Sequence, residues 1–512
     1  MRICTPPLIM TPILSPKSAL VGFFLLTLGG LCLFAQGEVA PDFQWRIGFD
    51  LKESSRPGAG GPSAAGSAER DRRIAGRRRI RGHGRFRRSG ADARVGAARD
   101  DRAAVQQLHT TAYCSASRAA LLSGRNDHRV SFGVISETVQ GFPGYNGIWR
   151  KDTTSMPEVL RRNGYSTAAF GKWHNTSPWE ISAVGPFDRW PTGLGFEYFY
   201  RFLGADTNQW FPKLYRNTLA VAPPATPAQG YVLNTDLADD AIRWLHIHDS
   251  KAPDKPYLLY FAPGATHEPL QAPKAWIEEY RGKFDGGYDR LREEIFQGQK
   301  KLGVIPADAE LTPRPPELPA WDSFSPDQKK LMARLMEAYA GFLAHTDYEI
   351  GRIVRAVRAD PHGDNTLVLF IAGDNGASAE GGFTGYELSS RLTLEERLPK
   401  LEEMGGVVSK GSTLYASGWA YALSSPFQWA KRIASHYGGT TAPLVVSWPA
   451  RIKDHGGLRT QFSHLNDIAA TVYEGAGIAA PEVMDGVKQL PLDGTSLVYS
   501  FDDPRAPATH KL

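Results

Sequence analysis

The sequence has very few cysteines for its length. Its 512 residues include only Cys4, Cys32 and Cys114. This number is too small for a disulfide scaffold, so a large hydrophobic core must hold the fold together. The first two cysteines lie in an N-terminal run that we expect to be removed. Cys114 would then be the single thiol of the mature chain, either as a buried structural residue or as a chemically used one.

Positions 54–105 have little that could build a core. This stretch contains 14 Arg, no Lys, 9 Gly and 11 Ala, but only four Val, Ile, Leu and Met together and one aromatic residue, Phe86. Such a composition cannot bury enough apolar surface to offset chain entropy, so it predicts disorder. The change of character is abrupt at both ends, which supports a second hypothesis, that this segment is read out of frame.

The chain also lacks a strong net charge. The formal value of +5 comes from the Arg-rich stretch, because the remaining residues carry four more acidic than basic side chains. No general attraction to nucleic acid follows from this balance, and no specific nucleic-acid partner is expected.

The N-terminus has the pattern of an export signal. Arg2 and Lys17 precede an apolar run over 19–34, which is followed by small residues at 35–37. The run is interrupted by two glycines and is short for a bilayer span. We therefore predict a signal peptide over 1–36, an N-terminal segment over 37–105 and a folded domain over 106–512. The mature protein would be periplasmic or secreted, with no stable membrane span.

After position 106, short apolar stretches alternate with helical patterns. The expected strands are 164–170, 256–262, 366–372 and 443–448, and the expected helices are 156–163, 234–248, 328–358 and 464–476. Continuous apolar strands between helices predict an α/β fold with a large, mostly parallel sheet covered on both faces. In such sheets, active sites gather at the carboxyl ends of the strands.

Chemically capable residues follow these segments. Residues 114–118 (Cys-Ser-Ala-Ser-Arg) open a helical pattern, and a helix N-terminus favours anions. Three expected strands lead into 171–174 (Gly-Lys-Trp-His), 266–269 (Thr-His-Glu-Pro) and 373–376 (Gly-Asp-Asn-Gly). Lys and His suit an anion, whereas Asp and Asn oxygens suit a hard cation. Taken singly, each motif also fits an ordinary surface loop, cap or turn.

Together these motifs resemble the type I sulfatases, which are arylsulfatase-like enzymes of the alkaline phosphatase superfamily. The resemblance covers about 106–512 and implies a large mixed sheet flanked by helices. It implies that Cys114 is oxidised to formylglycine, whose hydrate attacks sulfur, and that Arg118 belongs to the same signature. Ala116 departs from the commoner Pro.

The resemblance assigns roles to the other motifs as well. Lys172 would contact the sulfate and the formylglycine hydroxyl, and His174 would support that hydroxyl. His267 would protonate the leaving alcohol. Asp374 and Asn375 would bind Ca²⁺ or Mg²⁺.

A further sulfate-binding lysine is expected before a Gly pair and a strand that ends in Trp-Pro. Lys431 precedes Gly438 and Gly439, with a spacing one residue longer than usual. Lys410 is the alternative, although no Gly pair follows it. We choose Lys431.

These roles imply a sulfuric ester hydrolase that cleaves aryl or carbohydrate sulfate esters and depends on a formylglycine-generating enzyme for its maturation. Two alternatives stay open. One is a phosphodiester or phosphonate hydrolase of the same superfamily, and the other is a non-catalytic relic.

Two expected features are missing from the sequence. Sulfatases open with an apolar strand ending in Asp-Asp, and these carboxylates complete the metal site, but positions 54–105 contain no such strand. We therefore expect the first strand to be lost, the cation to be poorly bound and the activity to be impaired. The smaller C-terminal region of the family, with its antiparallel sheet, is also expected to be truncated, because the chain stops at Leu512.

Overall fold

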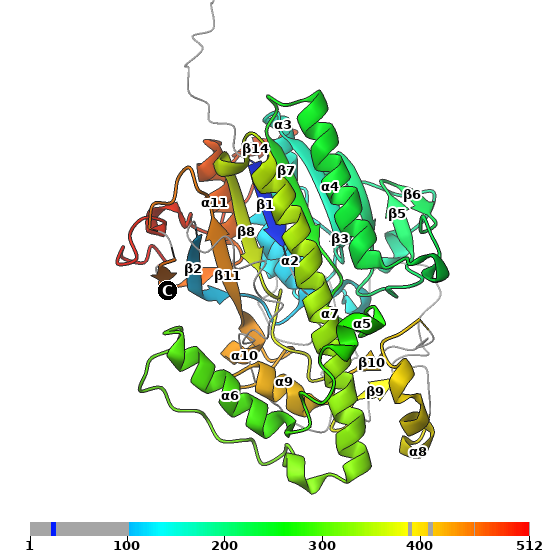
Figure 1. Cartoon of the computed structure of the whole chain (residues 1–512). Coiled ribbons are helices and arrows are strands. Elements are labelled where there is room, and N and C mark those ends of the chain that lie inside the picture. Colours follow the sequence, from blue (N-terminus) through cyan, green and yellow to red (C-terminus); the bar gives the residue numbers. More distant parts are fainter. Residues whose placement is uncertain (1–21, 27–101, 388–391, 408–412, 455, 511–512) are drawn as a thin grey trace, which may run out of the picture.

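The computed structural model describes residues 22–26, 102–387, 392–407, 413–454 and 456–510 (Figure 1). Its centre is a mixed sheet with the strand order β12-β2-β11-β8-β1-β7-β3-β4-β5-β6, and β13 also pairs with β2. The strands of this sheet are β1 (Gly22–Leu26), β2 (Arg102–His109), β3 (Ser166–Lys172), β4 (Tyr198–Phe202), β5 (Leu214–Arg216), β6 (Leu219–Val221), β7 (Tyr257–Ala262), β8 (Thr366–Ile371), β11 (Thr441–Ser447), β12 (Leu458–Arg459) and β13 (Ser463–His464). Two small sheets pair β9 (Tyr386–Glu387) with β10 (Thr413–Leu414) and β14 (Val483–Met484) with β15 (Val487–Lys488).

Helices cover both faces of the central sheet. On one face lie α4 (Leu233–Lys251) and α7 (Pro326–Ala359), and on the other lie α2 (Cys114–Ser123), α3 (Met156–Arg162) and α11 (Asp467–Ala476) (Figure 1). Because side chains alternate along a strand, Phe170 packs with the first layer and Ala169 with the second. The expected α/β architecture is confirmed, but β11 runs antiparallel to both of its neighbours, so the sheet is mixed.

A second hydrophobic cluster lies beyond one edge of the sheet. It joins the first half of α7 to α5 (Lys274–Glu278), α6 (Gly287–Lys301) and α9 (Ser417–Leu423). The short helices α8 (Leu394–Arg397) and α10 (Tyr437–Thr440) lie at the same end of the molecule (Figure 1). All four expected strands, now β3, β7, β8 and β11, and all four expected helices, now α3, α4, α7 and α11, are present.

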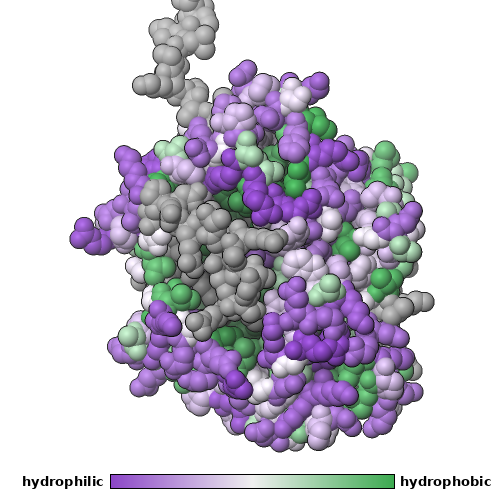
Figure 2. Space-filling view, viewed as in Figure 1, coloured by the Kyte–Doolittle hydropathy of each residue, from purple (hydrophilic) through white to green (hydrophobic). Residues whose placement is uncertain are grey.

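The face shown in Figure 2 is mainly hydrophilic, with small separate hydrophobic patches. Among the described residues, no helix combines the length and the apolar character needed to cross a membrane. The buried hydrophobic residues of the described part lie between the sheet and its two helical layers and in the cluster around the first half of α7.

The expectation that the first strand is missing is corrected by β1. This strand lies at the centre of the sheet and pairs in parallel with β7 on one side and β8 on the other (Figure 1). It comes from the apolar run that we assigned to a signal peptide, because a short apolar strand and the core of an export signal have the same composition. A removed segment cannot also be a sheet strand, so the signal peptide over 1–36 and the export that it implies stay predictions.

The described part of the chain also begins earlier than the expected domain boundary. β2 starts at Arg102, inside the Arg-rich segment, and pairs with β11. Disorder up to position 105 is therefore wrong for 102–105, whereas positions 54–101 lie outside the described residues.

We expect Phe24→Pro to unfold the domain or to destabilise it by about 3 kcal/mol or more. Phe24 is paired with Leu259 of β7 and Val368 of β8, and proline would remove a donor from a strand that has neighbours on both sides. Thermal melting measures the effect, with Ala508→Pro in an exposed C-terminal coil as the control. A purified, folded protein whose N-terminal residue lies beyond Leu26 would show instead that β1 is dispensable.

Candidate active site

The motif residues converge on one edge of the central sheet. The parallel strands β3, β7 and β8 end at this edge and lead to Lys172, His267 and Asp374. β2 is antiparallel to β11 and ends at the same edge, just before Cys114, while Lys431 precedes the amino end of β11. Segments that are far apart in sequence thus place their polar residues together at the carboxyl ends of the parallel strands, where active sites of such sheets lie.

Cys114 is the first residue of α2 and is fully buried. Two serine hydroxyl groups in the first turn of α2 hydrogen-bond to the loops that follow β3 and β8. The Ser115 Oγ donates to the His174 carbonyl oxygen at 2.7 Å, and the Ser117 Oγ donates to the Asp374 carbonyl oxygen. Burial raises the pKa of the Cys114 thiol, but Lys172 and His174 outweigh it, so the net pKa lies below its usual value. The site therefore favours a negative group at this position.

Arg118 connects α2 to the loop after β8. Its Nε donates to the Asp374 Oδ2 at 2.9 Å, its Nη2 lies 2.9 Å from the same oxygen, and its Nη1 donates to the Lys172 carbonyl oxygen at 2.8 Å. Both side chains of the Arg118–Asp374 pair are buried. The pair fixes the helix start relative to the ends of two strands.

Lys172 and His174 enter the site directly after β3. The Lys172 ammonium is fully buried, and none of the described residues accepts a hydrogen bond from it. His174 Nε2 donates to the Glu137 carboxylate at 2.6 Å. Burial lowers the pKa of His174, but Glu137 outweighs it and the net pKa is raised. The glycine before Lys172 is needed where it stands, because a Cβ on Gly171 would lie 2.1 Å from the Ala262 carbonyl oxygen of β7.

His267 follows β7 and is 7% exposed. Its Nδ1 lies 3.2 Å from the Glu268 carbonyl oxygen, which can only accept, so Nδ1 carries the proton. Its Nε2 is buried and has no hydrogen-bond partner among the described residues. Burial, together with the charges of Lys431 and Lys172, holds the pKa of His267 well below its ordinary value.

Lys431 is buried and pairs with Glu380, a residue that no sequence pattern singled out. Glu380 also pairs with Arg432 and accepts a hydrogen bond from the Ser378 Oγ at 2.7 Å. The second glycine of the pair after Lys431 has a packing role, because a Cβ on Gly439 would lie 2.3 Å from the Ile433 carbonyl oxygen. The alternative, Lys410, lies outside the described residues.

Glu380→Gln should tighten the binding of inorganic sulfate about three- to tenfold. The carboxylate neutralises Lys431 and competes with an anion for it, so removal of its charge leaves the ammonium available. Isothermal titration calorimetry with sulfate measures the change, and Glu402→Gln, in an exposed pair with Arg281, is the matched control. Unchanged or weaker sulfate binding would show that Lys431 does not meet the anion.

The described residues do not form a complete hard-cation site. The Asn375 Oδ1 is buried without a hydrogen-bond partner, which suits a cation, but the Asp374 carboxylate is engaged by Arg118 and by the Asn375 Nδ2. No other carboxylate or imidazole in the described ranges forms a mutually close set of three with Asp374. Ca²⁺ takes six to eight oxygen ligands, so the two residues identified from sequence are not sufficient. The chain after β1 supplies no carboxylate before Glu38.

Every site residue predicted from sequence thus lies at one sheet edge, while their catalytic and binding roles stay predictions. Glu137, Glu380 and Asp206 were missed. Glu137 lies in a short 3-10 helix and the other two lie in loops, all without a periodic or motif signal. Only the fold brings their carboxylates to the basic residues. We refer to Lys172, His174, His267 and Lys431 as the basic cluster.

Comparisons with known proteins agree with this arrangement. The profile of the family described as Sulfatase matches residues 99–478. An uncharacterised sulfatase of Schizosaccharomyces pombe is 30% identical over 398 residues, which cover 73% of this chain and 68% of the relative. An arylsulfatase of Klebsiella aerogenes is 27% identical over 409 residues, which cover 77% of this chain and 83% of the relative.

Solved structures are similar as well. The crystal structure of Ps i-CgsB in complex with k-i-k-neocarrahexaose has a TM-score of 0.51 and 19% sequence identity, and the match covers 80% of this chain and 71% of that one. At this identity the similarity shows the shared fold.

Proposed function

Because the chain belongs to the sulfatase family, we propose that it is a sulfuric ester hydrolase that uses Cys114, as formylglycine, to cleave aryl or carbohydrate sulfate esters. The observation that carries this proposal is the position of Cys114. It lies at a helix N-terminus beside the ammonium of Lys172 and the imidazole of His174. An anionic group bound there would meet positive charge on several sides.

The chain's own residues can bind and orient a sulfate ester. Lys172 has no other acceptor for its hydrogen bonds among the described groups, and Lys431 can exchange Glu380 for the substrate. Formylglycine at position 114 would supply, as its hydrate, the hydroxyl that attacks sulfur. The raised pKa of His174 favours its protonated form beside this position, and Glu137 fixes the orientation of the imidazole.

His267 is placed to donate a proton to the leaving alcohol through Nε2. In the free protein the lysine charges and burial keep it neutral. A bound sulfate would offset the charges of Lys172 and Lys431, so the pKa of His267 would rise on binding and Nε2 would take up a proton from solvent. No step is assigned to a cation, since the described residues do not complete a site for one.

Comparison of two chromogenic substrates tests this proposal. The chain is produced together with a formylglycine-generating enzyme and assayed with an aryl sulfate and an aryl phosphodiester. We expect preference for the sulfate, and loss of activity when the maturing enzyme is omitted. Faster turnover of the phosphodiester would favour the alternative hydrolase.

A second candidate function is favoured by the incomplete cation site. With only Asp374 and Asn375 as ligands, the chain would bind sulfate esters through the basic cluster and turn them over slowly. Tight binding of an aryl sulfate without turnover, by protein shown to carry formylglycine, would support this non-catalytic function.

A further inference from the structure

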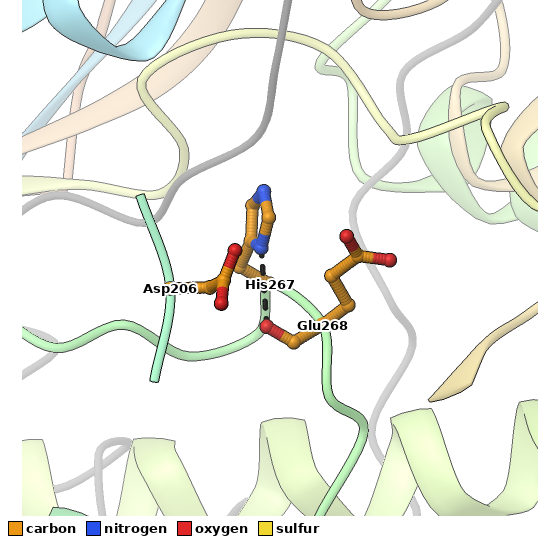
Figure 3. Close-up of side chains that lie close together, drawn as sticks. All are labelled: Asp206, His267 and Glu268. Carbon is orange, nitrogen blue, oxygen red and sulfur yellow. Dashed lines mark hydrogen bonds between the residues drawn. The ribbon is translucent and has the colours of Figure 1, made fainter. Parts of the chain in front are cut away.

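One carboxylate at the basic cluster has no role in the proposed mechanism. Asp206 lies between β4 and β5, and its side chain is exposed. Its carboxylate, a ring nitrogen of His267 and the Glu268 carboxylate lie within 4.8 Å of one another. Figure 3 shows Asp206 beside the imidazole of His267. None of the described residues donates a hydrogen bond to this carboxylate, so its acceptor oxygens are available to a ligand.

The segment that carries Asp206 is anchored on both sides. The Leu203 carbonyl oxygen accepts from the His174 N–H at 3.0 Å, before Asp206. After it, the Gln209 N–H donates to the Gln271 Oε1 at 2.8 Å, and the Gln209 carbonyl oxygen accepts from the Leu233 N–H at 2.9 Å. Both ends of the segment that carries Asp206 are therefore fixed at the site before any substrate binds, which reduces the entropy cost of binding.

The surroundings of Asp206 fit a hydrogen-bond donor better than a metal ion. The Nδ1 of His267 donates a hydrogen bond to the Glu268 carbonyl oxygen, so only Nε2 could bind a metal, and the proposed mechanism uses Nε2 at the ester oxygen. The positive charges of Lys172, His174 and Lys431 act on the Asp206 carboxylate and outnumber the negative charge of Glu137, which also acts on it. A divalent cation beside these groups would be repelled, whereas a neutral hydroxyl group would not.

We propose, on the basis of the proposed function, that Asp206 is a specificity-determining residue that accepts a hydrogen bond from a hydroxyl group next to the sulfated carbon. His267 would meet the ester oxygen, and the Asp206 carboxylate lies beside it, where a neighbouring hydroxyl of the alcohol would stand. The preferred substrates are therefore monosulfated sugars with vicinal hydroxyl groups rather than simple aryl sulfates. A second sulfate at that place would be repelled by the carboxylate.

Binding measurements test this inference without turnover. The full chain is produced without the maturing enzyme, so that Cys114 stays a thiol, and is titrated with glucose 3-sulfate, phenyl sulfate and inorganic sulfate. Asp206→Ala should weaken glucose 3-sulfate binding by about ten- to a hundredfold, the range for a hydrogen bond to a charged group. Inorganic sulfate should bind equally well or more tightly, which also shows that the variant is folded. Asp254→Ala, exposed before β7, is the matched control.

Three results would overturn the inference, and they separate it from the proposed function. If Asp206→Ala weakened the binding of all three ligands equally, or of none, Asp206 would not recognise the leaving group. The proposed binding of sulfate by the basic cluster would be unaffected by that result. Wild-type affinity for phenyl sulfate as high as for glucose 3-sulfate would lead to the same conclusion about Asp206. Calcium binding, measured without anion, that disappears in Asp206→Ala would assign these residues to a cation. Failure of the wild-type chain to bind any of the three anions would overturn the proposed function as well.

Discussion

Replacing Cys114 with alanine should abolish sulfate-ester hydrolysis, with a loss of at least about a thousandfold. The side chain stands at the start of α2 and next to the positive charges of Lys172 and His174. Removal of the group that becomes the nucleophile removes the covalent route itself, not merely one stabilising contact. Initial rates with an aryl sulfate measure the loss, in the unaltered chain or in the more active aspartate variant described below.

The fold should survive this change. Cys114 is buried, but alanine fills most of its space, so the melting temperature should fall only modestly. Ser123→Ala, at the other end of α2, is the control and should keep activity. Mass spectrometry of the peptide that contains Cys114 should show an aldehyde in place of the thiol. An unmodified thiol in fully active protein would contradict the assignment.

Replacing Thr27 and Leu28 with aspartate should create calcium-stimulated sulfatase activity. We expect a gain of about a hundredfold or more over the unaltered chain. β1 ends at Leu26, level with Phe261 of β7 and Phe370 of β8, at the edge where Asp374 and Asn375 stand. Carboxylates added directly after this strand would supply the oxygens that these two residues cannot provide. A cation there would offset sulfate charge at the reacting centre, and one well-placed stabilising group is worth about a hundred- to a thousandfold.

The gain in activity should depend on the negative charge of the two new side chains and on Asp374. Asparagine at the same two positions is the matched control and should give little activity. Chelator, or Asp374→Ala in the aspartate background, should return the rate to that of the chain as written. Replacement of positions 54–101 by a frame-corrected translation, which leaves β2 intact, is a separate test of whether that segment is read out of frame. High activity of the unaltered chain in the presence of chelator would show that no such cation is required.

β1 illustrates how far the sequence could be interpreted. The run that contains Gly22–Leu26 was identified as apolar, and its length fits either an export signal or a strand. Local composition does not distinguish these uses, because the decision depends on whether β7 and β8 leave a gap between them. That gap is a property of the assembled sheet, formed by strands more than two hundred residues further along the chain.

The sequence by itself determined the α/β fold and the strands β3, β7, β8 and β11, since unbroken apolar strands are local patterns. The residues of the basic cluster were predicted from the resemblance of short motifs to a known family, and Lys431 precedes a strand rather than following one. The tertiary structure decided which charges oppose one another. Arg118 engages Asp374, Glu137 orients His174, Glu380 pairs with Lys431, and Asp206 stands beside His267. These partners are separated by 37 to 256 positions or lie in loops without periodicity, and electrostatic contact depends on distance in space, which only the folded chain defines.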